Sequence, residues 1–256
     1  MRYFLTLVMV FSLLGVCQAE LRILGEVSPP GEYLDAAGQP AGATIELVRE
    51  LLSRLKVRAT IHILPWKRAY QMGLAEHNVV LMETTRTPER ETHFKWVGPI
   101  LIVKRIVYGL DSYDKPLKTI ADLRQGGTIC VLRGSSNEGY LQSLGITRIN
   151  AVTVPAQCLK MLAANRVQLF YTCEIGMDGL LKEQDLAADK VKALMDLKKE
   201  YLYLAFSKDV SDARIRRWQD ALETAKRDGT VARIYQGVYS PGTIKEICRP
   251  GDPLAP

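Results

Sequence analysis

The chain has 256 residues, of which 47% are hydrophobic and 24% are charged, a composition typical of folded globular proteins. Its net charge of +6 comes from 34 Lys and Arg against 28 Asp and Glu, which are spread along the chain instead of forming blocks. Because no basic run with interleaved aromatic residues occurs, the sequence does not favour a nucleic-acid-binding protein.

The first 19 residues have the pattern of a secretory leader. Arg2 precedes an apolar stretch from Leu5 to Val16, and Cys17-Gln18-Ala19 closes the segment. The apolar stretch is too short to span a bilayer as a helix, and one cation before an uninterrupted apolar run is typical of a cleaved leader. We therefore expect residues 1–19 to be a signal peptide and the product to be periplasmic, without a lipid anchor.

The chain then alternates between strand and helix patterns, which predicts an α/β fold. Thr44 is expected to cap a helix, because an apolar stripe with helical spacing follows it. A β-rich run from Gly98 to Leu110 is long enough to leave one lobe and enter another. The other elements expected in this half are strands at 21–24, 59–64 and 79–82 and a helix at 66–75.

A second α/β unit follows Asp114-Lys115-Pro116. Ser135 and Glu138 have the spacing of a capping box, which marks the start of a helix. An apolar strand at 201–206 is a candidate for crossing back to the first unit. The other elements expected here are strands at 128–132, 152–154 and 169–172, and helices at 155–165, 211–228 and 230–239.

The segment Thr84-Thr85-Arg86-Thr87-Pro88-Glu89-Arg90-Glu91 combines a helix start with an arginine. Thr87 can cap a helix whose first residue is Pro88, a position at which proline loses no hydrogen bond. Arg90 then falls in the first turn, and its guanidinium can clamp a carboxylate with two parallel hydrogen bonds. The alternative is an ordinary surface helix with an exposed arginine.

This segment, the strand before it and the run Phe94-Lys95-Trp96-Val97-Gly98-Pro99 resemble the first-lobe signature of the family 3 periplasmic solute-binding proteins. That family contains the polar amino-acid receptors of ABC importers, and Pro65-Trp66-Lys67-Arg68-Ala69 resembles a bacterial subgroup of it. The resemblance covers essentially the whole chain after the leader. It implies a two-lobed clamshell (type II) of doubly wound, mostly parallel sheets joined by two hinge strands. The implied first lobe is 20–106 and 203–256, and the second is 107–202.

The resemblance also implies roles for residues of the first lobe. Arg90 aligns with the arginine that holds the ligand carboxylate, and Thr85 aligns with a threonine that assists it. Glu83 stands where amino-acid receptors carry a small residue, so it either supplies charge to a ligand ammonium or faces solvent. Arg86 is either a second anion contact or a solvated neighbour.

In the second lobe, residues 131–138 resemble the family turn whose N–H groups open a helix toward the ligand carboxylate. The ligand contacts implied there are Ser135, Ser136 and Asn137, although helix capping explains the same residues. Tyr33 and Trp66 lie in regions that form aromatic walls around the ligand in relatives. A role in the core is the alternative for Trp66.

One departure from the family pattern concerns the ligand amine. Amino-acid receptors of the family carry an aspartate for the ligand ammonium where direct alignment places Cys173, and Glu174 comes next. If Glu174 reaches the cleft, an α-amino acid is a good candidate. If Cys173 is locked in a disulfide and Glu174 points away, the ligand is a carboxylate without an amine. The alternative to a ligand-binding role is that Glu174 is an ordinary surface residue.

Four cysteines follow the leader, at positions 130, 158, 173 and 248. An even number in an oxidising compartment suggests two disulfides. We expect a Cys158–Cys173 bridge, because both residues would lie at the carboxyl edge of the sheet in a right-handed βαβ unit. Free buried thiols are the alternative. The spacing of Cys and His predicts no zinc site, and we expect no cofactor.

The sequence therefore predicts a monomeric, non-enzymatic periplasmic protein that binds a small carboxylate-bearing ligand, in first place a polar amino acid or a derivative. Hinge closure around the ligand would present it to an ABC permease in the inner membrane. Two alternatives remain open. One is a cyclohexadienyl-dehydratase-like enzyme with Glu174 as general acid, and the other is an orphan ligand sensor without its own transporter. No Ser/His/Asp or Cys/His arrangement is evident in the sequence.

Overall fold

The structure is a computed structural model that describes residues 20–249 and residue 251. The predicted signal peptide, residues 1–19, lies outside the described residues. Among the helices that are described, none combines the length and the apolar character that a membrane span requires.

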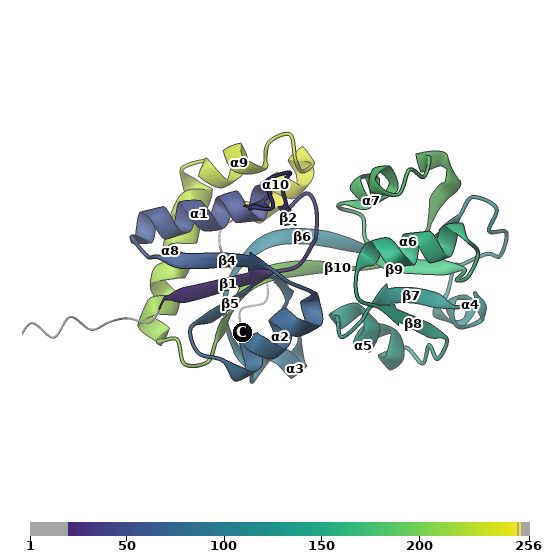
Figure 1. Cartoon of the computed structure of the whole chain (residues 1–256), viewed down its shortest axis with the longest axis horizontal. Helices are drawn as coiled ribbons and strands as arrows, with labels where there is room; N and C mark the ends of the chain where they lie inside the picture. The colour runs from purple at the N-terminus through teal and green to yellow at the C-terminus, as the bar shows by residue number, and fades with distance from the viewer. Residues whose placement is uncertain (1–19, 250, 252–256) are drawn as a thin grey trace, which may run out of the picture.

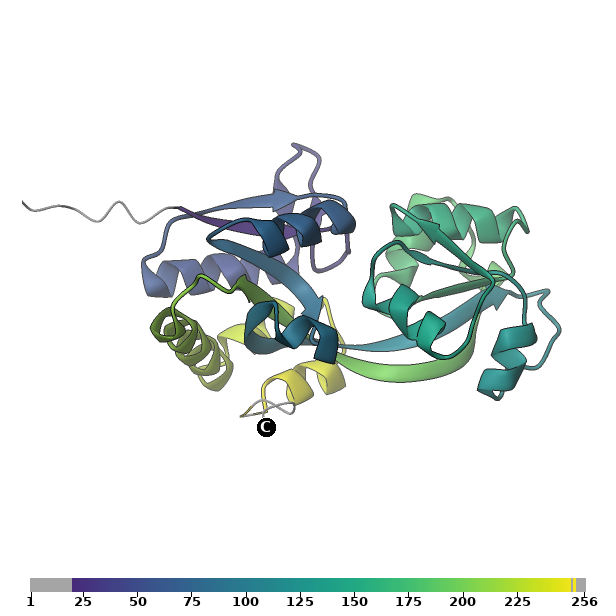
Figure 2. The same cartoon turned by 90° about the horizontal axis from the view of Figure 1, so that it is seen from below.

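Two α/β lobes lie side by side, and two long strands join them (Figures 1 and 2). These strands are β6 (Phe94–Leu110) and β10 (Val191–Ser207), which pair antiparallel along their length. In the first lobe β10 also pairs with β5 (Val79–Thr85), and in the second lobe β6 also pairs with β9 (Leu169–Cys173). The result is one sheet of order β4-β1-β5-β10-β6-β9-β7-β8 that runs through both lobes.

The first lobe contains parallel strands covered by helices, and the chain returns to it after β10. Its remaining strands are β1 (Leu21–Gly25), β2 (Tyr33–Leu34), β3 (Pro40–Ala41) and β4 (Ala59–Ile63). Its helices are α1 (Ala43–Leu55), α2 (Trp66–Ala75), α3 (Pro88–Glu91), α8 (Asp212–Arg227), α9 (Thr230–Tyr235) and α10 (Pro241–Ile247).

The second lobe repeats the parallel pattern, with β7 (Ile129–Leu132) between β8 (Ile149–Val152) and β9. Its helices are α4 (Ile120–Gln125), α5 (Ser136–Ser143), α6 (Pro155–Ala163) and α7 (Met177–Glu183), with a 3-10 turn at Ala188–Lys190. The predicted α/β fold of two doubly wound lobes is confirmed. The predicted lobe boundaries fall inside β6 and β10, which run unbroken through both points, so they stay a prediction.

Each lobe has its own hydrophobic core. In the first lobe α1 and α8 pack their apolar faces against the sheet, and Trp218 and Tyr235 are almost fully buried there. In the second lobe the residues above and below the sheet form two clusters, one under α6 and α7 around Phe170 and one beneath α4 and α5 around Leu141. Separate cores allow two lobes to move as rigid bodies about the strands between them.

One local prediction was wrong, and two others had the right element type with the wrong bounds. Thr44 does not cap α1, because Gly42 takes the cap position with φ 117° and Thr44 falls in the first turn. The strand predicted at 201–206 is confirmed as part of β10, but it already begins at Val191, since β6 supplies a hydrogen-bonding partner along its whole length. The helix predicted at 230–239 ends at Tyr235, and Ser240 caps a further helix, α10, which was not expected.

Candidate ligand-binding cleft

A cleft with about 760 Å³ of empty space lies between the lobes. Its walls come from residues of β5, β7 and β9 and from the segments that follow β1, β5, β7 and β9, as expected for ligand sites at the carboxyl ends of parallel strands. The strand β6 adds Arg105. The polar residues that line the cleft are Glu26, Ser28, Glu83, Thr85, Arg90, Arg105, Ser135, Ser136, Asn137, Tyr171, Thr172 and Cys173.

Arg90 is the cation of the first lobe that faces this cleft. Its guanidinium lies 5.2 Å from the ring centre of Trp66 and 5.0 Å from that of Tyr70, and Nη1 donates to the Thr85 carbonyl at 3.0 Å. The residue is only 6% exposed, and this burial lowers the pKa of Arg90. No carboxylate forms a salt bridge with Arg90 among the described residues. Its charge is therefore free to bind an anionic ligand group.

Trp66 connects the two lobes across the cleft. Its Nε1 donates to the Gly134 carbonyl of the second lobe at 3.0 Å. Gly134 belongs to the turn that enters α5, so the same contact places Ser135, Ser136 and Asn137 opposite Arg90 in the cleft wall. The lobes thus touch at one rim of the cleft, as they would in a closed clamshell.

The turn before α5 is ordered by its own hydrogen bonds. The Ser135 hydroxyl donates to the Leu132 carbonyl at 2.6 Å and accepts the Glu138 N–H at 3.4 Å. Asn137 is 6% exposed, and its Oδ1 has no hydrogen-bond partner among the described residues. Ser135 is therefore a helix cap that also faces the cleft, whereas Asn137 keeps an acceptor available for a ligand.

Carboxyl groups gather on the first-lobe side of the cleft. Glu83, at φ 41°, accepts the Thr44 hydroxyl at 2.6 Å, and burial raises its pKa to about 7. Burial and the neighbouring Glu83 raise the pKa of Glu26 to about 8. Behind them Glu32 is fully buried, accepts the Glu26 N–H at 3.1 Å and has a pKa raised well above its ordinary value by burial. This side of the cleft therefore suits a cation.

Arg105 and Cys173 form the floor between the lobes, where they are paired in the β6–β9 register. Arg105 Nε donates to Glu200 Oε2 at 2.5 Å. Burial opposes the charge on Arg105, but the facing carboxylate of Glu200 raises its pKa above the ordinary value. Tyr171, 1% exposed beside this pair, has a hydroxyl without a hydrogen-bond partner among the described residues.

Residues 21–240 match the sequence pattern of the bacterial extracellular solute-binding proteins, family 3. This chain belongs to that family. It is 22% identical over 212 residues to the "Probable amino-acid ABC transporter-binding protein" of Haemophilus influenzae, covering 80% of this chain and 78% of that protein.

Solved structures share the family fold. A histidine kinase sensor domain with similarity to periplasmic binding proteins superposes with a TM-score of 0.78 at 20% identity, covering 87% of this chain and 98% of that one. An ancestral arginine-binding protein bound to arginine superposes with a TM-score of 0.76, also at 20% identity, covering 86% of this chain and 98% of that one. These similarities establish the clamshell fold of this family member.

Seven of the ten site residues expected from the family resemblance line the cleft: Arg90, Thr85, Glu83, Ser135, Ser136, Asn137 and Trp66. The structure places the other three elsewhere. Tyr33 is exposed on β2, and Arg86 pairs with Glu91 and lies 5.8 Å from the Trp96 ring centre. Glu174 turns away and accepts the Lys104 N–H at 2.5 Å.

Sequence reasoning missed Glu26, Arg105 and Tyr171. Glu26 directly follows β1, so the rule that ligands bind at the carboxyl ends of strands could have pointed to it. Arg105 and Tyr171 lie inside strands. The sequence contains no signal for them, because their place in the cleft depends on how β6 and β9 pair.

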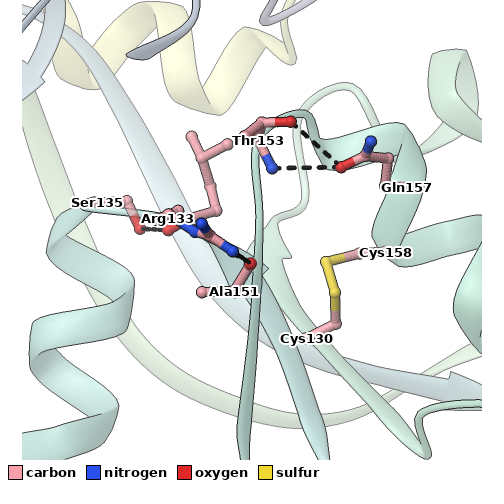
Figure 3. The surroundings of a disulfide bond; sticks show 8 residues. Cys130, Arg133, Ser135, Ala151, Thr153, Gln157 and Cys158 are labelled. Atoms are coloured by element: carbon pink, nitrogen blue, oxygen red, sulfur yellow. Dashed lines mark hydrogen bonds between the residues drawn. A yellow bond between two sulfur atoms is a disulfide. The ribbon is translucent and has the colours of Figure 1, made fainter. Parts of the chain in front are cut away.

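The predicted Cys158–Cys173 disulfide is wrong. The bridge joins Cys130 in β7 to Cys158 in α6, which packs against that strand, with Cα atoms 5.4 Å apart (Figure 3). Cys173 is a free thiol at the end of β9, where it donates to the Ile175 carbonyl at 3.0 Å and lines the cleft. Cys248 is also free. Within the described residues, no cluster of His, Cys, Asp and Glu has the arrangement of a metal site.

Proposed function

We propose that this protein is a periplasmic solute-binding protein that captures a small carboxylate-bearing ligand, in first place a polar amino acid or a derivative, and delivers it to an ABC permease. The observation that carries the proposal is the Arg90 guanidinium, which is buried in the cleft wall without a carboxylate partner among the described residues. Burying a charge is costly unless a counter-charge joins it, so a ligand carboxylate would complete this site.

Capture would use the two lobes together. Arg90 and Thr85 belong to the first lobe and the turn at Ser135 and Ser136 to the second, so a ligand bound by both sets would hold the lobes closed. The Trp66–Gly134 hydrogen bond at the rim would add to the closed state. A monomer suffices for this mechanism, because a single chain supplies both walls.

A thermal-shift screen of the purified protein against amino acids, keto acids and dicarboxylates tests the proposal. A specific ligand at a hundredfold excess over its Kd should stabilise the folded protein by about 2.7 kcal/mol. Arg90→Ala should abolish the shift for every carboxylate that binds. Arg86→Ala is the matched control, since Arg86 lies outside the cleft lining and pairs with Glu91. An unchanged shift in Arg90→Ala would remove Arg90 from the mechanism.

A sensor role for the same cleft is the second candidate, favoured by the likeness to a histidine kinase sensor domain. Transport and sensing would use the same ligand, and only the partner differs. Uptake of the radiolabelled ligand separates them. Deletion of the gene abolishes uptake if the protein serves a permease, and leaves uptake intact if it signals.

We further propose that the protein is not an enzyme. The dehydratase-like alternative needs Glu174 as a general acid in the cleft. The hydrogen bond between the Glu174 carboxylate and the Lys104 N–H supports binding over catalysis, because it directs this carboxylate away from the cleft lining. Incubation with a prephenate-like cyclic dicarboxylate, followed by absorbance, should show no product.

A further inference from the structure

A side chamber of about 380 Å³ continues the cleft beneath β6 and β10. The cleft and the chamber share six lining residues, among them Glu26, Glu83 and Arg105. Tyr239, from the segment after α9, lines the chamber but not the cleft. Arg90 lines the cleft but not the chamber, so a ligand group that enters the chamber lies some distance from a carboxylate bound to Arg90.

Polar atoms in and beside the chamber lack partners. Tyr239 is 7% exposed, and its hydroxyl has no hydrogen-bond partner in the described part of the chain. The same holds for Oε1 of Glu32, which lies behind Glu26. Glu83 differs from these groups, because its Oε1 already accepts a hydrogen bond from the Thr44 hydroxyl. Because buried polar atoms are almost always hydrogen-bonded, such vacant groups indicate that a polar ligand group belongs here.

The two carboxyl groups that line the chamber have no cation of their own among the described residues. Arg105 lines the chamber, but Glu200 already neutralises this cation. Glu26 and Glu83 form no salt bridge among the described residues. Among the side chains that the structure describes, the carboxyl groups that line the cleft are those of Glu26 and Glu83, and both belong to the first lobe. Once Arg90 has bound a ligand carboxylate, no unpaired cation of the described residues is left in the cleft to stabilise ionised Glu26 and Glu83, and a cationic ligand group would supply that charge.

We propose that Glu26, Glu83 and the Tyr239 hydroxyl bind a cationic nitrogen group at the far end of the ligand, so that the ligand is an amino acid with a basic side chain. The inference rests on the proposed function, because Arg90 must hold the carboxylate while the side chain enters the chamber. The two carboxylates accept hydrogen bonds from an ammonium or guanidinium, and the tyrosine hydroxyl can accept one as well.

Binding of this cation is coupled to proton release. In the ligand-free protein burial raises the pKa of Glu83 to about 7 and that of Glu26 to about 8, so at pH 7 Glu26 is mostly protonated and Glu83 is partly protonated. A nearby cation favours their ionised forms, and the protons leave. The other titratable groups facing the pair are Glu32, Arg90, Arg105, Cys173, Tyr235 and Tyr239.

Isothermal titration calorimetry with four amino acids tests the inference. L-Arginine and L-lysine carry the cation, whereas L-citrulline and L-norleucine have side chains of similar size without it. We expect each basic amino acid to bind at least about tenfold more tightly than its neutral analogue, the equivalent of one charged hydrogen bond. Titrations in two buffers of different ionisation enthalpy should reveal released protons, and affinity should rise from about pH 6 to about pH 8.

Two variants test whether the preference for a cationic side chain depends on the chamber. Glu83→Gln keeps the size of the side chain, and it should remove most of the preference for L-arginine over L-citrulline and part of the proton release. Glu174→Gln is the matched control, because this carboxyl group lies outside both the cleft and the chamber, and it should change neither.

The outcomes separate this inference from the proposed function. Equal binding of L-citrulline and L-arginine, or tight binding of a neutral or acidic amino acid alone, would overturn the cation site and leave the carboxylate receptor intact. An unchanged preference in Glu83→Gln would overturn it as well. If Arg90→Ala binds every ligand as the parent protein does, the proposed function itself fails.

Discussion

Arg105 and Glu200 form an ion pair at 2.5 Å between β6 and β10, the two strands that join the lobes. Their side chains are 13% and 5% exposed. Glu200 also accepts the Thr85 hydroxyl at 3.4 Å, and the Thr85 carbonyl accepts from Arg90. The pair therefore couples the strands between the lobes to the proposed carboxylate anchor, and it holds Arg105 in the cleft floor.

Glu200→Gln should destabilise the protein strongly, because Arg105 would stay buried without its counter-charge. Breaking a buried pair costs about 3 kcal/mol or more, which equilibrium unfolding in urea would measure. Glu246→Gln is the control, since Glu246 pairs with Lys199 near the surface and such pairs contribute less than about 1 kcal/mol. If both variants lose the same free energy of unfolding, the buried pair contributes no more to stability than the surface pair.

Trp66→Phe should weaken ligand binding without unfolding the protein. The variant keeps an aromatic ring beside Arg90 but loses the hydrogen bond to Gly134 in the second lobe. One neutral hydrogen bond contributes about 1 kcal/mol, so the Kd should rise about fivefold. The radius of gyration measured by X-ray scattering in the presence of ligand should rise as well.

Trp218→Phe provides the comparison for that variant. Trp218 lies in the core of the first lobe, and its Nε1 has no hydrogen-bond partner among the described residues. This substitution should lower the unfolding free energy and leave the Kd unchanged. A Kd that responds equally to both substitutions would argue against a closing role for Trp66.

The stability of the ligand-free protein should fall as the pH rises from 4.5 to about 8, because burial raises the pKa of Glu83 from 4.5 to about 7 and that of Glu26 to about 8. In this interval the unfolded state has released protons that the folded state still holds. The free energy of unfolding therefore falls as the pH rises. Thermal melts across this pH range would measure the slope. Glu83→Gln should flatten the curve, and a stability that rises through this interval would contradict the buried-carboxyl assignment.

Removing the Cys130–Cys158 bridge should destabilise the second lobe. The bridge closes a loop with a sequence separation of 28, and by loop entropy such a closure contributes about 3.5 kcal/mol. The double variant Cys130→Ala/Cys158→Ala should lose that amount in urea unfolding, and its melt should no longer respond to reductant. Cys173→Ala, which removes a free thiol, should keep the response. Loss of the response in Cys173→Ala would instead support the pairing expected from the sequence.

Short-range sequence patterns were sufficient to predict much of the fold and part of the candidate site. Pro88 at the first position of α3 and the turn before α5 were recognisable from short-range patterns, and both occur as expected. Helix starts depend on neighbouring residues, so a single chain contains their signals. The alternation of strands and helices was sufficient to predict the α/β class, and the family resemblance implied the two-lobed clamshell.

The tertiary structure decided which of two neighbouring side chains faces the ligand. Cys173 lines the cleft, whereas Glu174 turns to Lys104, because β9 pairs with β6 in one register. Glu174 directly follows the last residue of β9, where adjacent side chains of an extended chain point to opposite sides, so a shift of one residue in register would exchange the two. The disulfide was decided in the same way, since Cys130 and Cys158 meet only after α6 packs on β7.

The sequence by itself determined that this chain forms two α/β lobes with an arginine at the start of a short helix. Only the tertiary structure decided that Glu26 and Glu83, which are 57 positions apart by their numbers, share one wall with that arginine. Periodicity and caps act over a few residues, whereas the charge balance of a cleft arises when strand ends far apart in sequence are brought to one edge of a sheet.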